Sequence, residues 1–179
     1  MKNIIHIETL FNSREMTIDW SKVYQENLPK VFHYFCYKVG SIPLAEDLTA
    51  TVFEKAWKNR DKFDPRRGNP AFWLLGIARH TGYDHFRKPK REIVLEGLPE
   101  FSQDALLEDE IQKKINFQTI VKLLQQFPLR ERELITLKYG ADLSNQQIAH
   151  LTGLSESNVS TILNRVIDKL KREWERKNE

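Results

Sequence analysis

The chain has 179 residues, enough for one ordinary domain or for two small ones. Apolar residues make up 40% of it and charged residues 30%, so the chain can bury a core while keeping a charged surface. Gly and Pro number only 7 each, which argues against a turn-rich sandwich or barrel. The formal net charge of +3 is by itself too small to indicate a nucleic-acid partner.

Several classes of protein are excluded early. The single cysteine, Cys36, allows no intrachain disulfide and no cysteine-based zinc site. The longest unbroken apolar-or-glycine run, residues 71–78, is far too short to span a bilayer. The Ile4–Ile7 stretch is too short for a signal peptide. We therefore expect a cytoplasmic protein, with residues 1–19 as an N-terminal extension.

Helical periodicity dominates the first half of the chain. Apolar residues at helical spacing predict one helix over residues 24–39 and another over 45–57. Residues 40–43 (GSIP) are typical of a stop between them. The segment 63–70 (FDPRRGNP) contains two prolines and a glycine and predicts a loop, and a third helix is predicted over 71–86.

The charges are segregated along the chain. Residues 79–91 hold five basic residues and one acidic residue, whereas 92–118 hold seven acids and two lysines. Because the acidic segment shows no sustained apolar stripe before Ile115, residues 92–114 are predicted to form a linker. The expected fold is all-α: two small helical domains, residues 20–91 (the first half) and 115–179 (the second half), joined by this acidic linker.

The second half contains shorter helices. An apolar stripe over residues 120–127 is followed by Pro128, which suits the first turn of the next helix, and that helix ends at Gly140. Ser144 is a candidate N-cap for a short helix over 145–151. Ser155 or Ser157 can cap the last helix.

The spacing Ala149-x3-Gly153-x5-Val159 indicates a helix-turn-helix. A small alanine lets two helices cross closely, and glycine permits a left-handed turn between them. A purely structural helical hairpin would show the same spacing, but the basic tail at Lys169 and Lys171 favours DNA, because cations near phosphates supply much of the affinity. The second helix offers polar side chains for base edges and phosphates: Ser155, Glu156, Asn158, Ser160, Thr161, Asn164 and Arg165.

The segment 63–91 is the second candidate for nucleic-acid binding. Its basic residues are interleaved with aromatic ones, a combination that suits melted DNA because unstacked bases need a surface on which to stack. Composition alone favours the simpler interpretation, in which the aromatic side chains belong to the core and the basic run is a solvated face.

Enzyme classes find little support. His80 and His85 are five residues apart and so lie on different helix faces, unlike the i, i+4 spacing of metal ligands. The sequence contains no phosphate-binding glycine loop and no nucleophile-elbow motif. We expect no catalysis, no cofactor and no metal, and Cys36 is interpreted as inert core.

Taken together, the two halves resemble the extracytoplasmic-function (ECF) sigma factors of bacterial RNA polymerase. The segment AEDLTATVFEKAW (45–57) is similar to the polymerase-binding helix of that family. The segment 63–88 is similar to its promoter-melting and −10-reading region, and 127–173 to its −35-reading helix-turn-helix. The resemblance covers roughly residues 20–91 and 115–175.

The resemblance implies three partners: core RNA polymerase, promoter DNA and an anti-sigma factor. Glu46, Asp47 and Glu54 would face polymerase. The second half would dock on the −35 duplex, while the loop 63–70 captures a flipped −10 base. The residues implied at the −10 element are Arg66, Arg67, Asn69, Trp73, Arg79, His80, Tyr83, Arg87 and Lys88.

The chain departs from the family pattern in its last helix. Ser160, Ile162 and Ile167 stand where basic residues are common, which implies an unusual −35 sequence or weaker phosphate anchoring. The alternative to a sigma factor is a one-component helix-turn-helix regulator that never touches polymerase. Such a regulator would not need the 63–91 segment.

Overall fold

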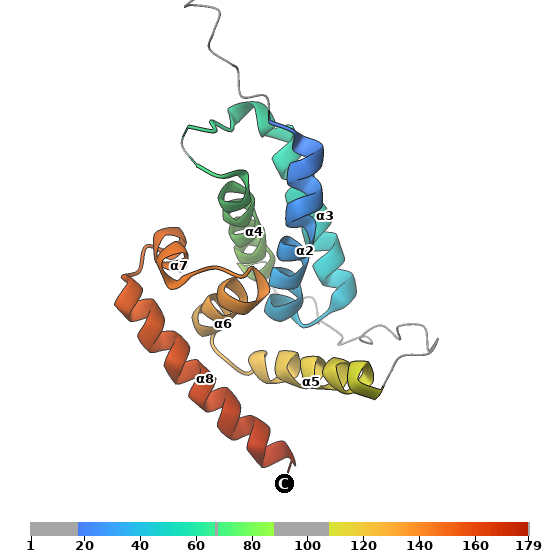
Figure 1. Ribbon diagram of the computed structural model, residues 1–179, viewed down its shortest axis with the longest axis vertical. Coiled ribbons are helices and arrows are strands. Elements are labelled where there is room, and N and C mark those ends of the chain that lie inside the picture. The colour runs from blue at the N-terminus through green and yellow to red at the C-terminus, as the bar shows by residue number, and fades with distance from the viewer. Residues whose placement is uncertain (1–17, 67, 88–107, 179) are drawn as a thin grey trace, which may run out of the picture.

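The computed structural model describes residues 18–66, 68–87 and 108–178, and within these ranges it contains helices and no strand (Figure 1). This confirms the all-α prediction. The helices of the first half are α2 (Trp20–Val39), α3 (Ile42–Lys58), the short η1 (Arg60–Lys62) and α4 (Pro70–Arg87). They are followed by α5 (Glu108–Leu124), α6 (Leu129–Ile135), the π-helical turn η2 (Thr136–Gly140), α7 (Asn145–Thr152) and α8 (Glu156–Asn178).

The break between α2 and α3 is shorter than the sequence indicated. Gly40 adopts a left-handed conformation (φ 73°) and closes α2, and the Ser41 side chain caps α3. Ile42 and Pro43, which were expected to be part of the stop, therefore belong to α3. Proline is tolerated there because the first turn of a helix has no intrahelical partner for its N–H.

The predicted linker overlaps a helix. Helix α5 begins at Glu108, inside the segment 92–114 that was expected to connect the two halves. The rest of that segment up to residue 107, and residues 1–17 of the N-terminal extension, lie outside the described residues.

The helix-turn-helix forms through local capping. Ser144 and Gln147 make a reciprocal capping box at the start of α7, and Gly153 closes that helix in a left-handed conformation (φ 73°). The Ser155 hydroxyl then accepts a hydrogen bond from the Asn158 N–H at 3.2 Å, so Ser155 caps α8. Since each of these bonds links residues only a few positions apart, the sequence pattern predicted the motif correctly.

The two halves share one hydrophobic core. Val52 and Leu74 of the first half belong to the same buried cluster as Leu134 and Val166 of the second. Figure 1 shows α6 and η2 lying against α2, between the first-half helices and the long α8.

Gly140 marks the closest approach between the halves. A Cβ atom added at Gly140 would lie 3.0 Å from the Tyr34 Cα and 3.1 Å from the His33 carbonyl oxygen, both in the backbone of α2. Because backbone atoms of a packed helix cannot move aside, this contact requires glycine.

We expect the thiol of Cys36 to be unreactive in the folded chain. The side chain is 3% exposed, and burial, together with the Glu46 carboxylate, raises the pKa of the thiol to about 12. The thiolate is the reactive species. Mass spectrometry after iodoacetamide treatment at pH 8 should therefore show almost no alkylation of the native chain and full alkylation in denaturant. Equal rates in the two conditions would contradict the burial of Cys36.

Candidate nucleic-acid interface

The start of the 63–70 loop is anchored by aromatic stacking. The Phe63 ring lies 5.9 Å from the Trp20 ring of α2 and 5.3 Å from the Trp73 ring of α4, centroid to centroid. Trp73 is therefore half-buried within this cluster and does not stand on an open surface. This position agrees with the simpler interpretation of the aromatic residues as core.

The end of the same loop is fixed by a helix cap. The side-chain Oδ1 of Asn69 accepts a hydrogen bond from the Ala71 N–H at 2.8 Å. The backbone carbonyl oxygen of Asn69 accepts one from the Phe72 N–H at 3.0 Å. Asn69 thus caps α4, with Pro70 as the first helical residue. Both ends of the 63–70 loop are therefore held by contacts, the first by aromatic stacking and the second by the helix cap.

Two of the predicted loop residues face solvent. Asn69 is exposed, and the side chain of Arg66 is 92% exposed although it lies 3.8 Å from the Asp64 carboxylate. Arg67 lies outside the described residues. The loop and α4 line a cavity of about 420 Å³, which is within the size range of small-molecule pockets. This partly polar cavity lies beside the loop that the family resemblance implies for base capture, and its size is compatible with binding an unstacked base.

The exposed face of α4 carries three of the predicted residues. His80, Tyr83 and Arg87 are exposed and follow one another at i, i+3 and i+7, which places them on one side of the helix. Tyr83 is 45% exposed, so part of its ring is open to solvent on the same side as His80 and Arg87. Lys88 lies outside the described residues.

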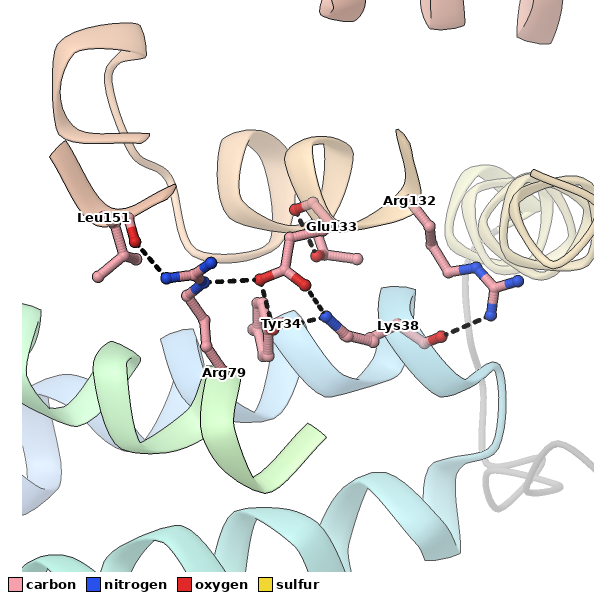
Figure 2. A network of polar contacts seen from close by, with 7 residues as sticks. Tyr34, Lys38, Arg79, Arg132, Glu133 and Leu151 are labelled. Atoms are coloured by element: carbon pink, nitrogen blue, oxygen red, sulfur yellow. Dashed lines mark hydrogen bonds and ion pairs between the residues drawn. The ribbon is translucent and has the colours of Figure 1, made fainter. Parts of the chain in front are cut away.

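Arg79 points elsewhere, to the second half of the chain. Its Nε donates a hydrogen bond to the Glu133 Oε1 at 2.9 Å, and its Nη1 donates to the Leu151 carbonyl oxygen of α7 (Figure 2). Burial alone would lower the pKa of the Arg79 guanidinium, but the hydrogen bond to the Glu133 carboxylate and the charge of that group raise it. In this arrangement Arg79 joins the two halves.

Glu133 is the centre of a buried polar cluster between the halves. It is 2% exposed and accepts hydrogen bonds from the Tyr34 hydroxyl at 3.2 Å and from the Lys38 ammonium, both on α2 (Figure 2). Burial lowers the pKa of Lys38, and the nearby Glu133 carboxylate opposes that shift. Burial also raises the pKa of Tyr34, and the Glu133 carboxylate raises it further. The Glu133 carboxylate thus bonds to two cations and a hydroxyl.

Arg132 adds a second link beside it. Its guanidinium donates to the Lys38 carbonyl oxygen at 3.1 Å and to the carbonyl oxygens of Gln125 and Phe127 at 2.8 and 3.2 Å. Arg132 therefore ties the end of α2 to the turn between α5 and α6.

The sequence analysis did not single out Lys38, Arg132 or Glu133. One signal was available: Lys38 lies between Phe35 and Val39 on the buried stripe of α2, and lysine is almost never fully buried without a partner. Its partner could not be identified, because Glu133 lies 95 residues away.

The predicted recognition helix, α8, presents most of its polar residues to solvent. Val159 and Leu163 are buried against the rest of the helix-turn-helix, while Ser160 is half-buried. Ile162 and Ile167 pack partly on the core, so basic residues would be poorly placed at these positions. The exposed predicted residues are Ser155, Glu156, Asn158, Thr161, Asn164 and Arg165.

Arg165 is held in place by Glu131 of α6. The Arg165 Nη2 donates to the Glu131 Oε1 at 2.7 Å, and the Arg165 side chain remains 56% exposed. The ion pair fixes the direction of the guanidinium and leaves much of its surface open to solvent.

The three acidic residues expected to face polymerase are exposed on α3. Glu46 lies at the edge of an apolar groove of about 490 Å³ between α2 and α3, lined also by Tyr24, Phe32 and Phe53. Glu54 is paired with Lys58, whose hydrogen bond and charge lower the pKa of the Glu54 carboxyl. This face combines apolar surface with negative charge.

Two kinds of feature are absent from the described ranges, residues 18–66, 68–87 and 108–178. None of the helices there is long and apolar enough to cross a membrane. Within the same ranges, no group of three or more His, Cys, Asp or Glu side chains is arranged to hold a metal ion.

A helical domain with a basic loop and helix, followed by a helix-turn-helix domain, defines a two-part transcription protein. Family models agree: residues 23–92 match Sigma-70 region 2, and residues 123–172 match Sigma-70 region 4. The chain belongs to the ECF RNA polymerase sigma factors, a family of DNA-binding transcription regulators.

Two ECF RNA polymerase sigma factors are similar to this chain over most of its length. SigM of Bacillus subtilis is 28% identical over 158 residues, covering 87% of this chain and 94% of SigM. SigW of the same species is 30% identical, covering 79% of this chain and 81% of SigW.

Two solved structures share the fold. The sigma factor RpoE from Bartonella quintana, in complex with the anti-sigma factor NepR, superposes with a TM-score of 0.69 at 22% identity, covering 86% of this chain and 95% of that one. CnrH, in complex with the cytosolic domain of CnrY, gives a TM-score of 0.59 at 18% identity, covering 87% and 85% of the two chains.

Replacing Asn69 by alanine should destabilise the first half by about 1 kcal/mol, because α4 loses its side-chain cap. Asn69→Asp retains the accepting oxygen and should change the stability little. Urea unfolding followed by circular dichroism measures both. Equal destabilisation by the two substitutions would contradict the capping role.

Proposed function

We propose that this chain is a cytoplasmic, non-catalytic alternative sigma factor that binds core RNA polymerase, reads a −35 element and melts a −10 element. The observation that supports this best is the combination of a helix-turn-helix with a separate loop-and-helix unit, the 63–70 loop and α4. A plain repressor needs only the first of these. Neither a cofactor nor a metal is required.

At the −10 element, the 63–70 loop receives an unstacked base of the non-template strand. Unpairing a base costs a few kcal/mol, and the captured base must regain this through stacking and hydrogen bonds. Asn69 offers an amide donor at the cavity, while Arg66 and the predicted Arg67 offer positive charge to the backbone. His80, Tyr83 and Arg87, with the predicted Lys88, extend this surface along α4.

At the −35 element, α8 enters the major groove with its exposed polar side chains toward the bases. Asn158, Thr161 and Asn164 suit base edges, because their side chains hydrogen-bond to bases or phosphates. Arg165 is placed for a phosphate. Only one of these side chains is cationic, so we expect modest affinity for the isolated −35 duplex.

For polymerase binding, helix α3 supplies the contact surface. Glu46, Asp47 and Glu54 provide negative charge to a basic surface of the core enzyme, and the adjacent groove between α2 and α3 provides apolar area.

The partner that restrains the chain is an anti-sigma factor. RpoE of Bartonella quintana is seen with NepR, and CnrH with the cytosolic domain of CnrY. By this similarity of fold we expect this chain to be bound by a protein of the same kind.

Transcription by purified core polymerase, with and without the chain, tests the proposal. On genomic DNA of the source organism, the chain should produce specific transcripts whose 5′ ends define a shared −35/−10 pattern. A one-component regulator would give neither these transcripts nor a complex with core polymerase, so that result would replace the sigma factor with the alternative.

Asn69→Asp should impair promoter opening more than closed-duplex binding, because it keeps the α4 cap but removes the amide donor and adds a negative charge. Permanganate reactivity of −10 thymines measures opening, and a gel shift of the holoenzyme on duplex measures binding. An equal loss at both steps would argue against base capture by this loop.

Arg165→Ala should weaken binding to the −35 duplex and reduce the slope of log K against log salt by about one. Lys22→Ala, an exposed cation on α2, is the matched control and should leave the slope unchanged. If Arg165→Ala also leaves the slope unchanged, Arg165 makes no phosphate contact.

A further inference from the structure

A carboxylate outside the helix-turn-helix holds the cation that is assigned to the −35 element. Glu131 lies in the first turn of α6, a helix that packs against α8 (Figure 1). Its Oε1 accepts the hydrogen bond from the Arg165 Nη2 at 2.7 Å. Arg165 is the only cation among the α8 residues assigned to this element, so its direction decides where that set offers positive charge to DNA.

The Glu131 side chain is fixed more firmly than that of Arg165. It is only 12% exposed, whereas the Arg165 side chain is 56% exposed. The second carboxylate oxygen of Glu131, Oε2, is buried and has no hydrogen-bond partner among the described residues. Such an atom has lost water without compensation, and within the same residues Arg165 is the one group bonded to the carboxylate. Glu131 therefore places the Arg165 guanidinium, rather than the reverse.

The ion pair is not what holds α6 on α8. Leu134 of α6 and Val159 and Val166 of α8 are buried in one apolar cluster. Burial of such side chains stabilises the contact far more than an ion pair whose arginine is half exposed. The buried Oε2 without a partner reduces the contribution of the pair further. The main consequence of the pair is thus the direction of Arg165.

An arginine that is held contacts DNA more selectively than one that is free. Sequence-independent affinity arises because mobile cations reach phosphates anywhere along a duplex. Glu131 engages one of the five donors of Arg165, so the guanidinium offers its other donors in one direction relative to α8. A phosphate meets those donors without further ordering of the side chain only where α8 is seated at one position in the groove.

We propose that Glu131 is a positioning residue that sets the −35 specificity of the chain through Arg165. This inference rests on the proposed function and adds to it a residue that makes no contact with DNA itself. Because the Arg165 side chain is ordered before DNA binds, the correctly seated complex gains most from it. Without Glu131, Arg165 follows phosphates of any sequence.

Glu131→Ala, measured in the holoenzyme formed from the full chain and core polymerase, tests this role. Competition gel shifts give the affinity for a promoter found by the transcription experiment above and for the same fragment with a scrambled −35 element. The ratio of the two affinities should fall by about three- to tenfold, which corresponds to the cost of ordering one long side chain. An unchanged ratio would overturn the proposal.

Two matched variants separate the hydrogen bond from the charge. Glu131→Gln keeps an accepting oxygen for Arg165 but removes the charge, and it should retain most of the ratio. Asp168→Asn removes an exposed carboxylate that lies on α8 three positions after Arg165, and it should leave the ratio unchanged. A loss in either variant equal to that in Glu131→Ala would make charge the cause and overturn the positioning role.

The double variant Glu131→Ala/Arg165→Ala shows whether Glu131 acts through Arg165. Its ratio should equal that of Arg165→Ala alone, and a further fall would overturn the proposal. Circular dichroism verifies that all the variants are folded. A parent holoenzyme that does not distinguish the two fragments would instead overturn the proposed reading of a −35 element, so the two failures are distinguishable.

Discussion

The buried carboxylate of Glu133 is the interaction on which the arrangement of this molecule depends. It accepts hydrogen bonds from Tyr34 and Lys38 of α2 and from Arg79 of α4, so one side chain of the second half binds two helices of the first. An isolated charge at this depth would be very costly, and only the complete set of partners makes burial of Glu133 tolerable.

The same cluster connects architecture to function through Arg79. We propose Arg79 as a contact for −10 DNA, yet here it bonds to Glu133 and to the backbone of α7. A guanidinium keeps its charge in either environment and carries five donors, so it suits both a carboxylate and a phosphate. The donors that Arg79 would use in the proposed contact with DNA are thus the ones that it uses in the contact between the halves.

Local features of the fold were predictable because their causes are local. The capping box of Ser144, the left-handed Gly153 and the Ser155 cap involve residues a few positions apart, and the predicted helix-turn-helix has the expected form. The error at Ile42 and Pro43 has the same origin: proline both ends and begins helices, and the pattern around Gly40 did not distinguish the two. Asn69 was predicted from family resemblance, whereas its capping bond became visible only in the structure.

By itself, the sequence determined the helical class, the two-part organisation, the helix-turn-helix and the polar faces of α4 and α8, because periodicity and caps act over one or two turns of chain. Only the tertiary structure decided that α7 lines the cavity beside the 63–70 loop, that Gly140 closely approaches the α2 backbone, and that Lys38 pairs with a residue 95 positions away. Such contacts depend on the simultaneous packing of several helices, which no local pattern of residues specifies.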